Sequence, residues 1–232
     1  MKKIGIIGAM ELEVEALKSQ MNVRETFKRA SMDFFAGTLN ETDVVIVKSG
    51  IGKVNAALCA QILIDVFQVT HIINTGVAGS LNADLDIGDI LVSKDAIYHD
   101  MDVRVFGYAI GQVPGFDVVS FPANADMVRI ALETCQEVNP EIKAVSGRVA
   151  SGDQFISSKD VKEAIIANVK GDCAEMEGAS IAHAAYLSHI PFVIIRAISD
   201  KADDSAEMDY PTFEREAAKH SANLVAHMIC RL

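Results

Sequence analysis

The chain has 232 residues, half of them hydrophobic, and a formal net charge of −11. This length and composition predict one globular domain over residues 1–232 and exclude a disordered chain. The negative charge argues against nucleic acid as a partner, because phosphate contacts need a basic surface. Neither a secretory signal of normal length nor an apolar run of about eighteen residues is present, so we expect a cytoplasmic protein without membrane contact. The four cysteines are widely separated without a CxxC pair, which fits reduced thiols.

Short apolar runs along the chain predict strands that are buried on both faces. They are rich in Ile and Val and do not alternate with polar residues. Strands of this kind usually belong to a mostly parallel sheet that helices cover. The predicted strands cover residues 3–9, 43–50, 71–79, 89–93 and 191–199.

Helical patterns alternate with these strands. Apolar residues recur at helical spacing, Ser157 and Ser158 offer N-terminal caps, and Pro211 precedes the last segment. The predicted helices cover residues 53–67, 125–138, 157–169, 177–189 and 212–232. Alternating strands and helices predict a single α/β domain, in which ligands bind beyond the carboxyl ends of the strands.

Two nucleotide-binding motifs and a metal site are excluded. The segment "SGIGKVN" contains Gly52-Lys53, but Val47 and Val54 occupy the positions where a P-loop needs Gly and Ser or Thr. The segment "IGIIGAM" lacks the G-x-G-x-x-G spacing of a dinucleotide fold. The segment "HDMD" has no matching cluster at ligand spacing, so no metal is expected.

Carboxylates remain at several predicted strand ends. Glu13 follows the first strand, Glu175 and Glu177 flank Met176, and Asp200 follows "VIIRAIS". A single carboxylate in such a place is often a solvated helix start, which the helix dipole favours. Several carboxylates at the ends of one sheet instead suggest a shared cleft. Two of them can cleave a glycosidic bond, since one protonates the leaving group and the other activates water.

Six segments resemble one family. "GIIGAMELEV", "KSGIGKVNAA", "INTGVAGSL", "VSGRVASGDQFI", "AEMEGASIAH" and "RAISDKAD" occur in the order and at the distances found in the bacterial 5′-methylthioadenosine/S-adenosylhomocysteine nucleosidases of the purine nucleoside phosphorylase-like superfamily. The resemblance spans nearly the whole chain. It implies a mixed, mostly parallel central sheet flanked by helices. It also implies hydrolysis of the N-glycosidic bond of these two nucleosides, with 5′-deoxyadenosine as a further substrate and no cofactor or metal.

The resemblance also implies roles for individual residues. Asp200 would protonate adenine N7, Glu13 would activate water, and Glu177 would bind the ribose hydroxyls. Arg196 would organise the water on the Glu13 side, and Ser199 would orient Asp200. The remaining expected substrate-binding residues are Met10, Ile51, Val77, Ala78, Gly79, Phe155, Ile156, Glu175, Met176 and Tyr210. Phe155 would stack on adenine and the backbone at Ile156 would read the purine edge.

The family is homodimeric, and a loop of the partner subunit closes the pocket. Val103, Phe106 and Pro114 match that loop. Two residues depart from the usual pattern: Val77 replaces a common serine, and Tyr210 replaces a common phenylalanine. Two other functions stay open, a phosphorolytic nucleoside phosphorylase and a purine-nucleoside sensor without catalysis. The first needs a phosphate site, which the acidic "MELEVE" segment would repel.

Overall fold

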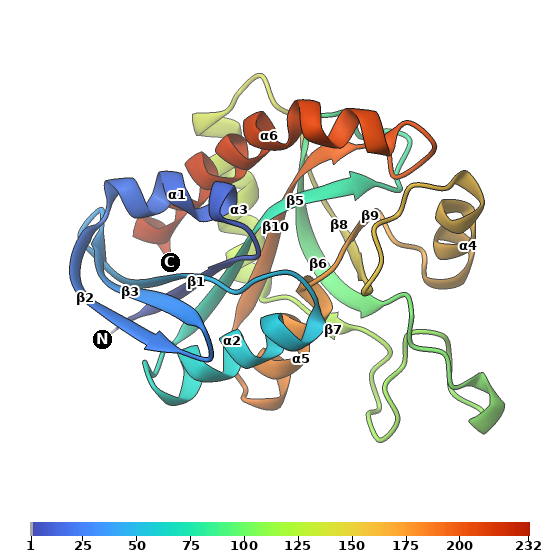
Figure 1. The fold of residues 1–232 in the computed structure, drawn as a ribbon, viewed down its shortest axis with the longest axis horizontal. Helices are drawn as coiled ribbons and strands as arrows, with labels where there is room; N and C mark the ends of the chain where they lie inside the picture. The colour runs from blue at the N-terminus through green and yellow to red at the C-terminus, as the bar shows by residue number, and fades with distance from the viewer. Residues whose placement is uncertain (1) are drawn as a thin grey trace.

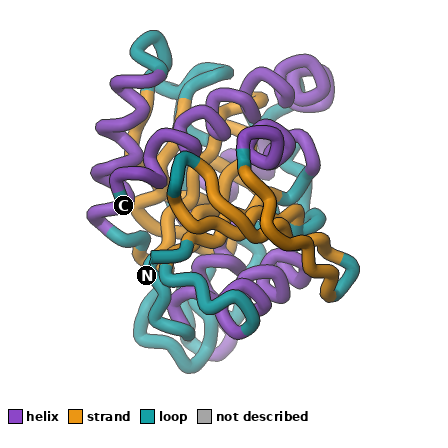
Figure 2. The backbone as a smooth tube through the Cα atoms, turned by 90° about the vertical axis from the view of Figure 1, so that its left-hand side faces the viewer, coloured by secondary structure: helices purple, strands orange, loops and turns teal. Residues whose placement is uncertain are grey.

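The computed structural model describes residues 2–232, and it places a mixed β-sheet between two layers of helices (Figures 1 and 2). The strands are β1 Ile4–Gly8, β2 Asn22–Arg29, β3 Met32–Leu39, β4 Thr42–Lys48, β5 His71–Ser80, β6 Ile90–Tyr98, β7 Phe121–Pro122, β8 Ala144–Ser151, β9 Cys173–Glu175 and β10 Phe192–Asp200. The helices are α1 Glu11–Gln20, α2 Lys53–Asp65, α3 Ala125–Val138, α4 Lys159–Val169, α5 Gly178–Leu187 and α6 Ala206–Met228, with short 3₁₀ turns at Arg104–Phe106 and Ile229–Arg231.

Parallel pairing connects β4, β1, β5 and β10, and again β6, β8 and β9. Antiparallel pairing adds the β2–β3 hairpin to β4 and joins β10 to β6 and β5 to β9. Since β5 pairs with both β10 and β9, the strands β5, β10, β6, β8 and β9 form a closed ring of pairings. This ring brings the ends of β9 and β10 beside the last residues of β5.

Helices cover both faces of the sheet. In Figure 1, α1, α3 and α6 lie on one side, and α2 and α5 lie on the other. Leu17 of α1 and Leu224 of α6 are fully buried in the first layer, and Leu63 of α2 and Ile181 of α5 in the second. Burying each such side chain contributes about 1.5–3 kcal/mol. Across residues 2–232, every helix is too short or too polar to span a bilayer.

The five apolar runs form the strands β1, β4, β5, β6 and β10, which confirms the expected α/β sheet. The β2–β3 hairpin was not predicted, because β2 is almost entirely exposed and polar. Its turn also lacks a glycine signal: Ala30 and Ser31 themselves adopt positive φ angles of 47° and 63°. Strand β8 was missed as well, since polar and glycine residues interrupt its apolar pattern.

The last helix begins earlier than predicted. Helix α6 starts at Ala206, whereas proline chemistry placed its start at residue 212. The carbonyl of Ser205 accepts the amides of Met208 and Asp209, and the Ser205 hydroxyl donates to the Asp209 carboxylate at 2.6 Å. These contacts hold a first turn before Pro211, which therefore lies inside the helix. The extra turn carries Tyr210 towards the carboxyl ends of the strands.

Candidate active site

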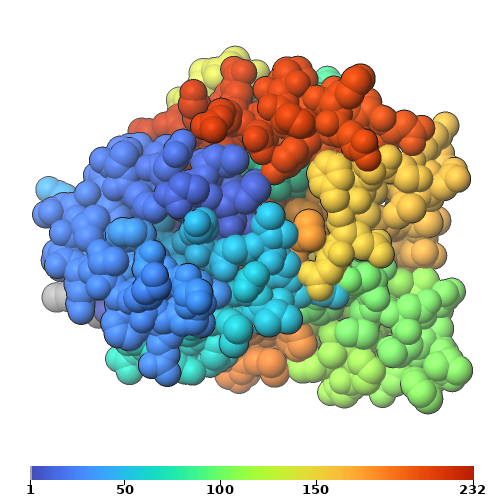
Figure 3. Space-filling view, in the orientation of Figure 1, coloured from blue at the N-terminus to red at the C-terminus, as the bar shows by residue number. Residues whose placement is uncertain are grey.

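A cavity of about 350 Å³ opens where the ends of β1, β4, β9 and β10 meet the loop after β8. Figure 3 shows the hollow bordered by the start of α1 in blue, the start of α2 in cyan, the loop 152–158 in yellow and α6 in red. This is the edge at which α/β sheets bind ligands. The lining residues are Ala9, Met10, Glu13, Ile51, Val77, Ala78, Gly79, Phe155, Ala174, Glu175, Met176, Glu177, Ser199, Asp200 and Tyr210.

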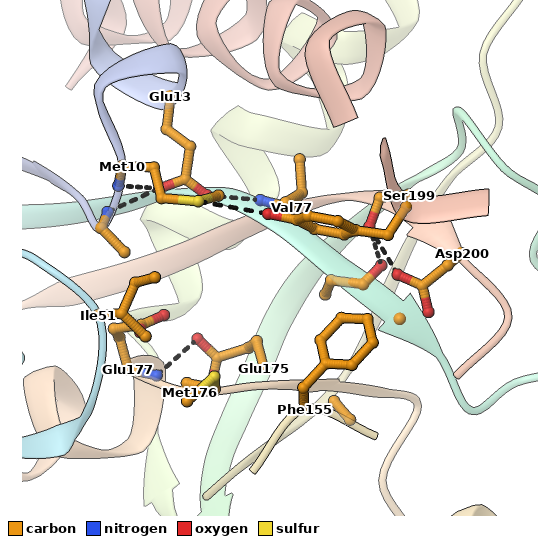
Figure 4. A pocket seen from close by; sticks show the side chains of 15 residues that line it. Met10, Glu13, Ile51, Val77, Phe155, Glu175, Met176, Glu177, Ser199 and Asp200 are labelled. Atoms are coloured by element: carbon orange, nitrogen blue, oxygen red, sulfur yellow. Dashed lines mark hydrogen bonds between the residues drawn. The ribbon is translucent and has the colours of Figure 1, made fainter. Parts of the chain in front are cut away.

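Glu13 lies in the first turn of α1, and its buried carboxylate reaches the cavity wall (Figure 4). Its Oε2 accepts the amides of Ala9 at 2.6 Å and Met10 at 2.9 Å, and Oε1 accepts the amide of Val77 at 3.1 Å. A Cβ at Gly76 would lie 2.4 Å from Oε1, so glycine leaves the room that this carboxylate occupies. Burial raises the pKa of Glu13, and a nearby guanidinium and the three amides oppose that rise. Such a fixed carboxylate suits a general base.

Asp200 is the last residue of β10 and lies opposite Gly79 in the β5–β10 register. The Ser199 hydroxyl donates to its Oδ2 at 2.8 Å, and the Ala202 amide donates to its Oδ1 at 2.8 Å. A Cβ at Gly79 would lie 2.7 Å from Oδ1, which again reserves space for the carboxyl group. Burial raises the pKa of Asp200, and the two hydrogen bonds oppose this rise. The side chain is thereby suited to hold a proton that it can donate.

Glu177 precedes α5 on the opposite side of the cavity from Asp200 (Figure 4). Its Oε1 accepts the amide of Gly52, at the start of α2, at 2.8 Å. Burial, followed by the negative charge of Glu175, raises the pKa of Glu177 to about 8. The three cavity acids Glu13, Glu177 and Asp200 thus approach one volume from three directions.

Glu175, a lining residue of the cavity, forms a buried ion pair with Arg196. Arg196 Nη2 donates to Glu175 Oε2 and to Asn74 Oδ1. Glu175 also accepts the Ser151 hydroxyl and, at 2.8 Å, the Gly178 amide. Because Glu175 already has these partners, its carboxylate anchors the site and the neighbouring Glu177. Removing one member of such a pair leaves an uncompensated buried charge.

Apolar side chains form the rest of the wall. Met10 and Ile51 lie near Glu13 and Glu177, and Phe155 lies near Asp200 (Figure 4). The Tyr210 hydroxyl donates to Met10 Sδ at 3.3 Å, and its ring meets that of Phe155 edge-on, with centroids 5.5 Å apart. Tyr210 therefore connects the two ends of this apolar wall.

The structure brings most of the predicted site residues to this cavity, and five lie elsewhere. Arg196 is buried and does not line the cavity, but it donates a hydrogen bond to Glu175, which does. Ile156 lines a small adjoining cavity of about 40 Å³ that also reaches Asp200. Val103, Phe106 and Pro114 lie on the loop between β6 and β7, outside the cavity of their own chain. Their role in a partner's pocket stays a prediction.

Sequence reasoning missed four residues that hold the acids. Asn74 accepts a hydrogen bond from Arg196, and Ser151 donates one to Glu175. The amide of Ala9 donates to Glu13, and the amide of Gly52 donates to Glu177. Asn74 gave one usable signal, since a lone amide within an apolar strand needs a buried partner. The amide contacts gave none, because any residue supplies a backbone N–H.

The cavity is acidic. Glu13, Glu175, Glu177 and Asp200 all line it, and no Lys, Arg or His is found among the described lining residues. Over residues 2–232, no group of three or more His, Cys, Asp or Glu side chains is placed to hold a metal ion. The arrangement can donate a proton, hold water and stabilise positive charge.

Comparison with known proteins identifies the family of the chain. The family model of the phosphorylase superfamily matches residues 3–229. A 5′-methylthioadenosine/S-adenosylhomocysteine nucleosidase from Geobacillus sp. (strain WCH70) is 41% identical over 231 residues, which cover 99% of each chain.

Two solved structures of nucleosidases with that same name are also similar. One from Colwellia psychrerythraea 34H, in complex with adenine, has a TM-score of 0.96 and 42% identity, covering 100% of this chain and 96% of that one. One from Neisseria meningitidis, in complex with methylthio-immucillin-A, has a TM-score of 0.96 and 35% identity, covering 100% of both chains. The chain therefore belongs to the 5′-methylthioadenosine/S-adenosylhomocysteine nucleosidase family of the phosphorylase superfamily.

Proposed function

We propose that the chain hydrolyses the N-glycosidic bond of 5′-methylthioadenosine and S-adenosylhomocysteine, releasing adenine and the corresponding thioribose. The observation that carries this proposal is a cavity lined by four carboxylates and, among the described residues, by no cationic side chain. The names and the bound purine compounds of the similar proteins supply the substrate class. By the same chemistry, 5′-deoxyadenosine is a further substrate.

Asp200 is the proposed general acid. Adenine leaves poorly as an anion, and a proton on N7 lets it leave as a neutral base. A carboxyl group with an ordinary pKa is ionised at neutral pH and has no proton to give. Burial raises the pKa of Asp200, and contacts from Ser199 and Ala202 hold both of its oxygens. These features support its assignment as the acid, with Phe155 and the backbone at Ile156 beside the purine.

Glu13 is the proposed base for the attacking water. Three amides fix the direction of its carboxylate, and its raised pKa makes the carboxylate a stronger proton acceptor. Arg196 is a positioning residue in this proposal. It contributes positive charge near Glu13 and holds Glu175, but it is not itself a lining residue of the cavity.

Glu177 is proposed to accept the ribose hydroxyls. When the bond to adenine breaks, the sugar becomes electron-poor and resembles an oxocarbenium ion. The ionised forms of Glu13 and Glu177 would stabilise this positive charge more strongly than they stabilise the neutral substrate. Because burial raises the pKa of Glu177 to about 8, its contribution grows as pH rises towards that value. Differential stabilisation of this kind accelerates the reaction. The apolar wall of Met10, Ile51 and Tyr210 is left for the 5′-thio group.

The two alternatives fit the cavity less well. A phosphorylase must hold phosphate, but four carboxylates line this cavity, and the buried Arg196 is already bound to Glu175 and Asn74. A sensor needs to bind a purine nucleoside, but it has no use for an acid and a base that face each other across its site. Hydrolysis uses both carboxylates.

Glu13→Gln tests the proposal, and Glu15→Gln is its matched control on the same helix, because Glu15 is exposed. We expect Glu13→Gln to lower kcat for adenine release from 5′-methylthioadenosine by about 10²–10⁴-fold, the usual worth of a general base. Glu15→Gln should keep wild-type turnover. Wild-type protein that binds the nucleoside without releasing adenine would establish the sensor instead.

We further propose that the active form is a homodimer in which the loop between β6 and β7 closes the partner's pocket. Phe106 on this loop is 76% exposed, and α2 presents Val54 and Leu58 to solvent. Val103 and Pro114 lie on the same loop. Sedimentation should give twice the mass of one chain, and Phe106→Ala should raise KM. A monomer with full activity would refute this part.

The place of the reaction is proposed from its substrates. Both nucleosides are by-products of S-adenosylmethionine chemistry, so we propose a cytoplasmic enzyme that serves methionine salvage and the activated methyl cycle. The four free thiols are compatible with a reducing compartment. Deletion of the gene should raise the cellular concentration of both nucleosides, and unchanged concentrations would contradict this role.

A further inference from the structure

Three charged side chains outside the cavity, Lys53, Asp100 and Asp153, form a connected group that we term the clasp. Lys53 begins α2, Asp100 follows β6, and Asp153 lies in the loop after β8. The Lys53 ammonium donates to Asp100 Oδ2 at 2.6 Å and lies 3.8 Å from Asp153 Oδ2. The amide of Asp153 also donates to Asp100 Oδ2, at 3.1 Å. The clasp thus ties three distant parts of the chain together.

The clasp meets the active site at two neighbouring amides. The amide of Gly52 donates to Glu177 Oε1 at 2.8 Å, and the next amide, that of Lys53, donates to Asp153 Oδ1 at 2.9 Å. One end of α2 therefore holds both a cavity carboxylate and the loop that carries Phe155. Phe155 lies only two residues beyond Asp153 and is 48% exposed, so its own packing restrains it weakly.

We propose that Asp153 is a positioning residue that fixes Phe155, and with it the purine side of the cavity, relative to Glu177. This inference rests on the proposed function, in which the purine lies against Phe155. Asp153 does not line the cavity and touches no substrate in this proposal. It acts through the Lys53 amide, which sets the distance between the loop 152–158 and the start of α2.

A purely structural role for Asp153 predicts that its loss lowers the melting temperature without a change in KM. The positioning role predicts the opposite. The side chain of Asp153 is 51% exposed, and exposed ion pairs contribute little to folding stability. Loss of its carboxylate should therefore leave the melting temperature unchanged. Phe155 contacts the purine both before and during bond cleavage, so a displaced loop weakens binding in both states. Such a loss raises KM and leaves kcat unchanged.

The test compares Asp153→Ala and Asp153→Asn with wild type, with Asp33→Ala as control, because Asp33 forms an exposed ion pair on the β2–β3 hairpin. Asp153→Ala should raise KM for 5′-methylthioadenosine and the Kd for adenine by about tenfold, the effect of losing most of one stacking contact between a base and an aromatic ring. Its kcat should stay within about twofold of wild type. Asp153→Asn keeps an oxygen for the Lys53 amide, so most of the binding should return.

Three results would overturn the proposal. Adenine binding by Asp153→Ala at wild-type affinity is the first. Loss of folding or a lowered melting temperature in Asp153→Ala, without a change in KM, is the second. Failure of Asp153→Asn to restore binding is the third. If wild-type protein releases no adenine, the proposed function fails, whereas the adenine titration still tests the clasp.

Discussion

Glu177→Gln should make the protein more stable at high pH while it slows turnover. In the folded chain, burial and the charge of Glu175 raise the pKa of Glu177 from 4.5 to about 8. At a pH between these two pKa values, Glu177 is therefore protonated in the folded state and ionised in the unfolded state. Stability must fall as pH rises through this window, because folding keeps the carboxyl group from ionising.

The size of the effect follows from the two pKa values. At 1.36 kcal/mol per pKa unit, ionising this carboxyl group in the folded chain rather than in the unfolded chain costs about 5 kcal/mol. This cost is the upper limit of the stability that Glu177→Gln gains over wild type above about pH 8. Glutamine carries no charge, and its side-chain oxygen still accepts the Gly52 amide. The variant should thus approach this gain at about pH 9 and lose it at about pH 4.

Urea unfolding of both proteins at matched concentration, over the range from about pH 4 to about pH 9, measures the difference. We expect the stability curves to converge at low pH and to separate as pH rises. Turnover of 5′-methylthioadenosine should be slower in the variant at every pH. A stability difference that does not change with pH would refute the reasoning, and so would a variant that is less stable than wild type at the highest pH.

Three further substitutions test the other parts of the site. Asp200→Asn keeps hydrogen-bonding capacity but has no proton to donate, so kcat for adenine release should fall by about 10²–10⁴-fold, and near-normal turnover would remove Asp200 as the acid. Arg196→Met leaves Glu175 buried without its partner, so urea unfolding should show that the free energy of unfolding falls by about 3–5 kcal/mol. A decrease no larger than the one caused by replacing an exposed lysine would contradict the importance of the buried pair. Tyr210→Phe removes the hydroxyl that donates to Met10 Sδ, which should raise kcat/KM for 5′-methylthioadenosine relative to S-adenosylhomocysteine by up to about tenfold, since a methyl group prefers an apolar wall; an unchanged ratio would exclude Tyr210 from selectivity.

The sequence predicted the parts of the fold that carry a strong apolar signal. Buried strands such as β1 and β10 are runs of Ile and Val, and the residues at their ends were therefore placed near one another correctly. The family resemblance then supplied individual roles that composition and periodicity do not contain. Those roles for Glu13, Glu177 and Asp200 stay predictions, although the three side chains do share one cavity.

What the sequence did not predict depends on long-range or backbone contacts. Strand β2 is exposed and polar, so its pairing with β3 leaves no apolar pattern. The amides that hold Glu13 and Glu177 belong to residues whose identity does not matter for the contact. The role of Arg196 beside Glu13 and the water stays a prediction, and nothing in the sequence indicated that Asn74 and Glu175 would bind its guanidinium.

Hydrolysis requires that water, and not phosphate, attacks the sugar. The most direct measurement is the rate of adenine release from 5′-methylthioadenosine in buffer without phosphate and again with increasing phosphate, together with identification of the sugar product. The acidic cavity predicts full turnover without phosphate, no acceleration when phosphate is added, and an unphosphorylated methylthioribose. Phosphate-dependent release with a sugar 1-phosphate as product would contradict the account.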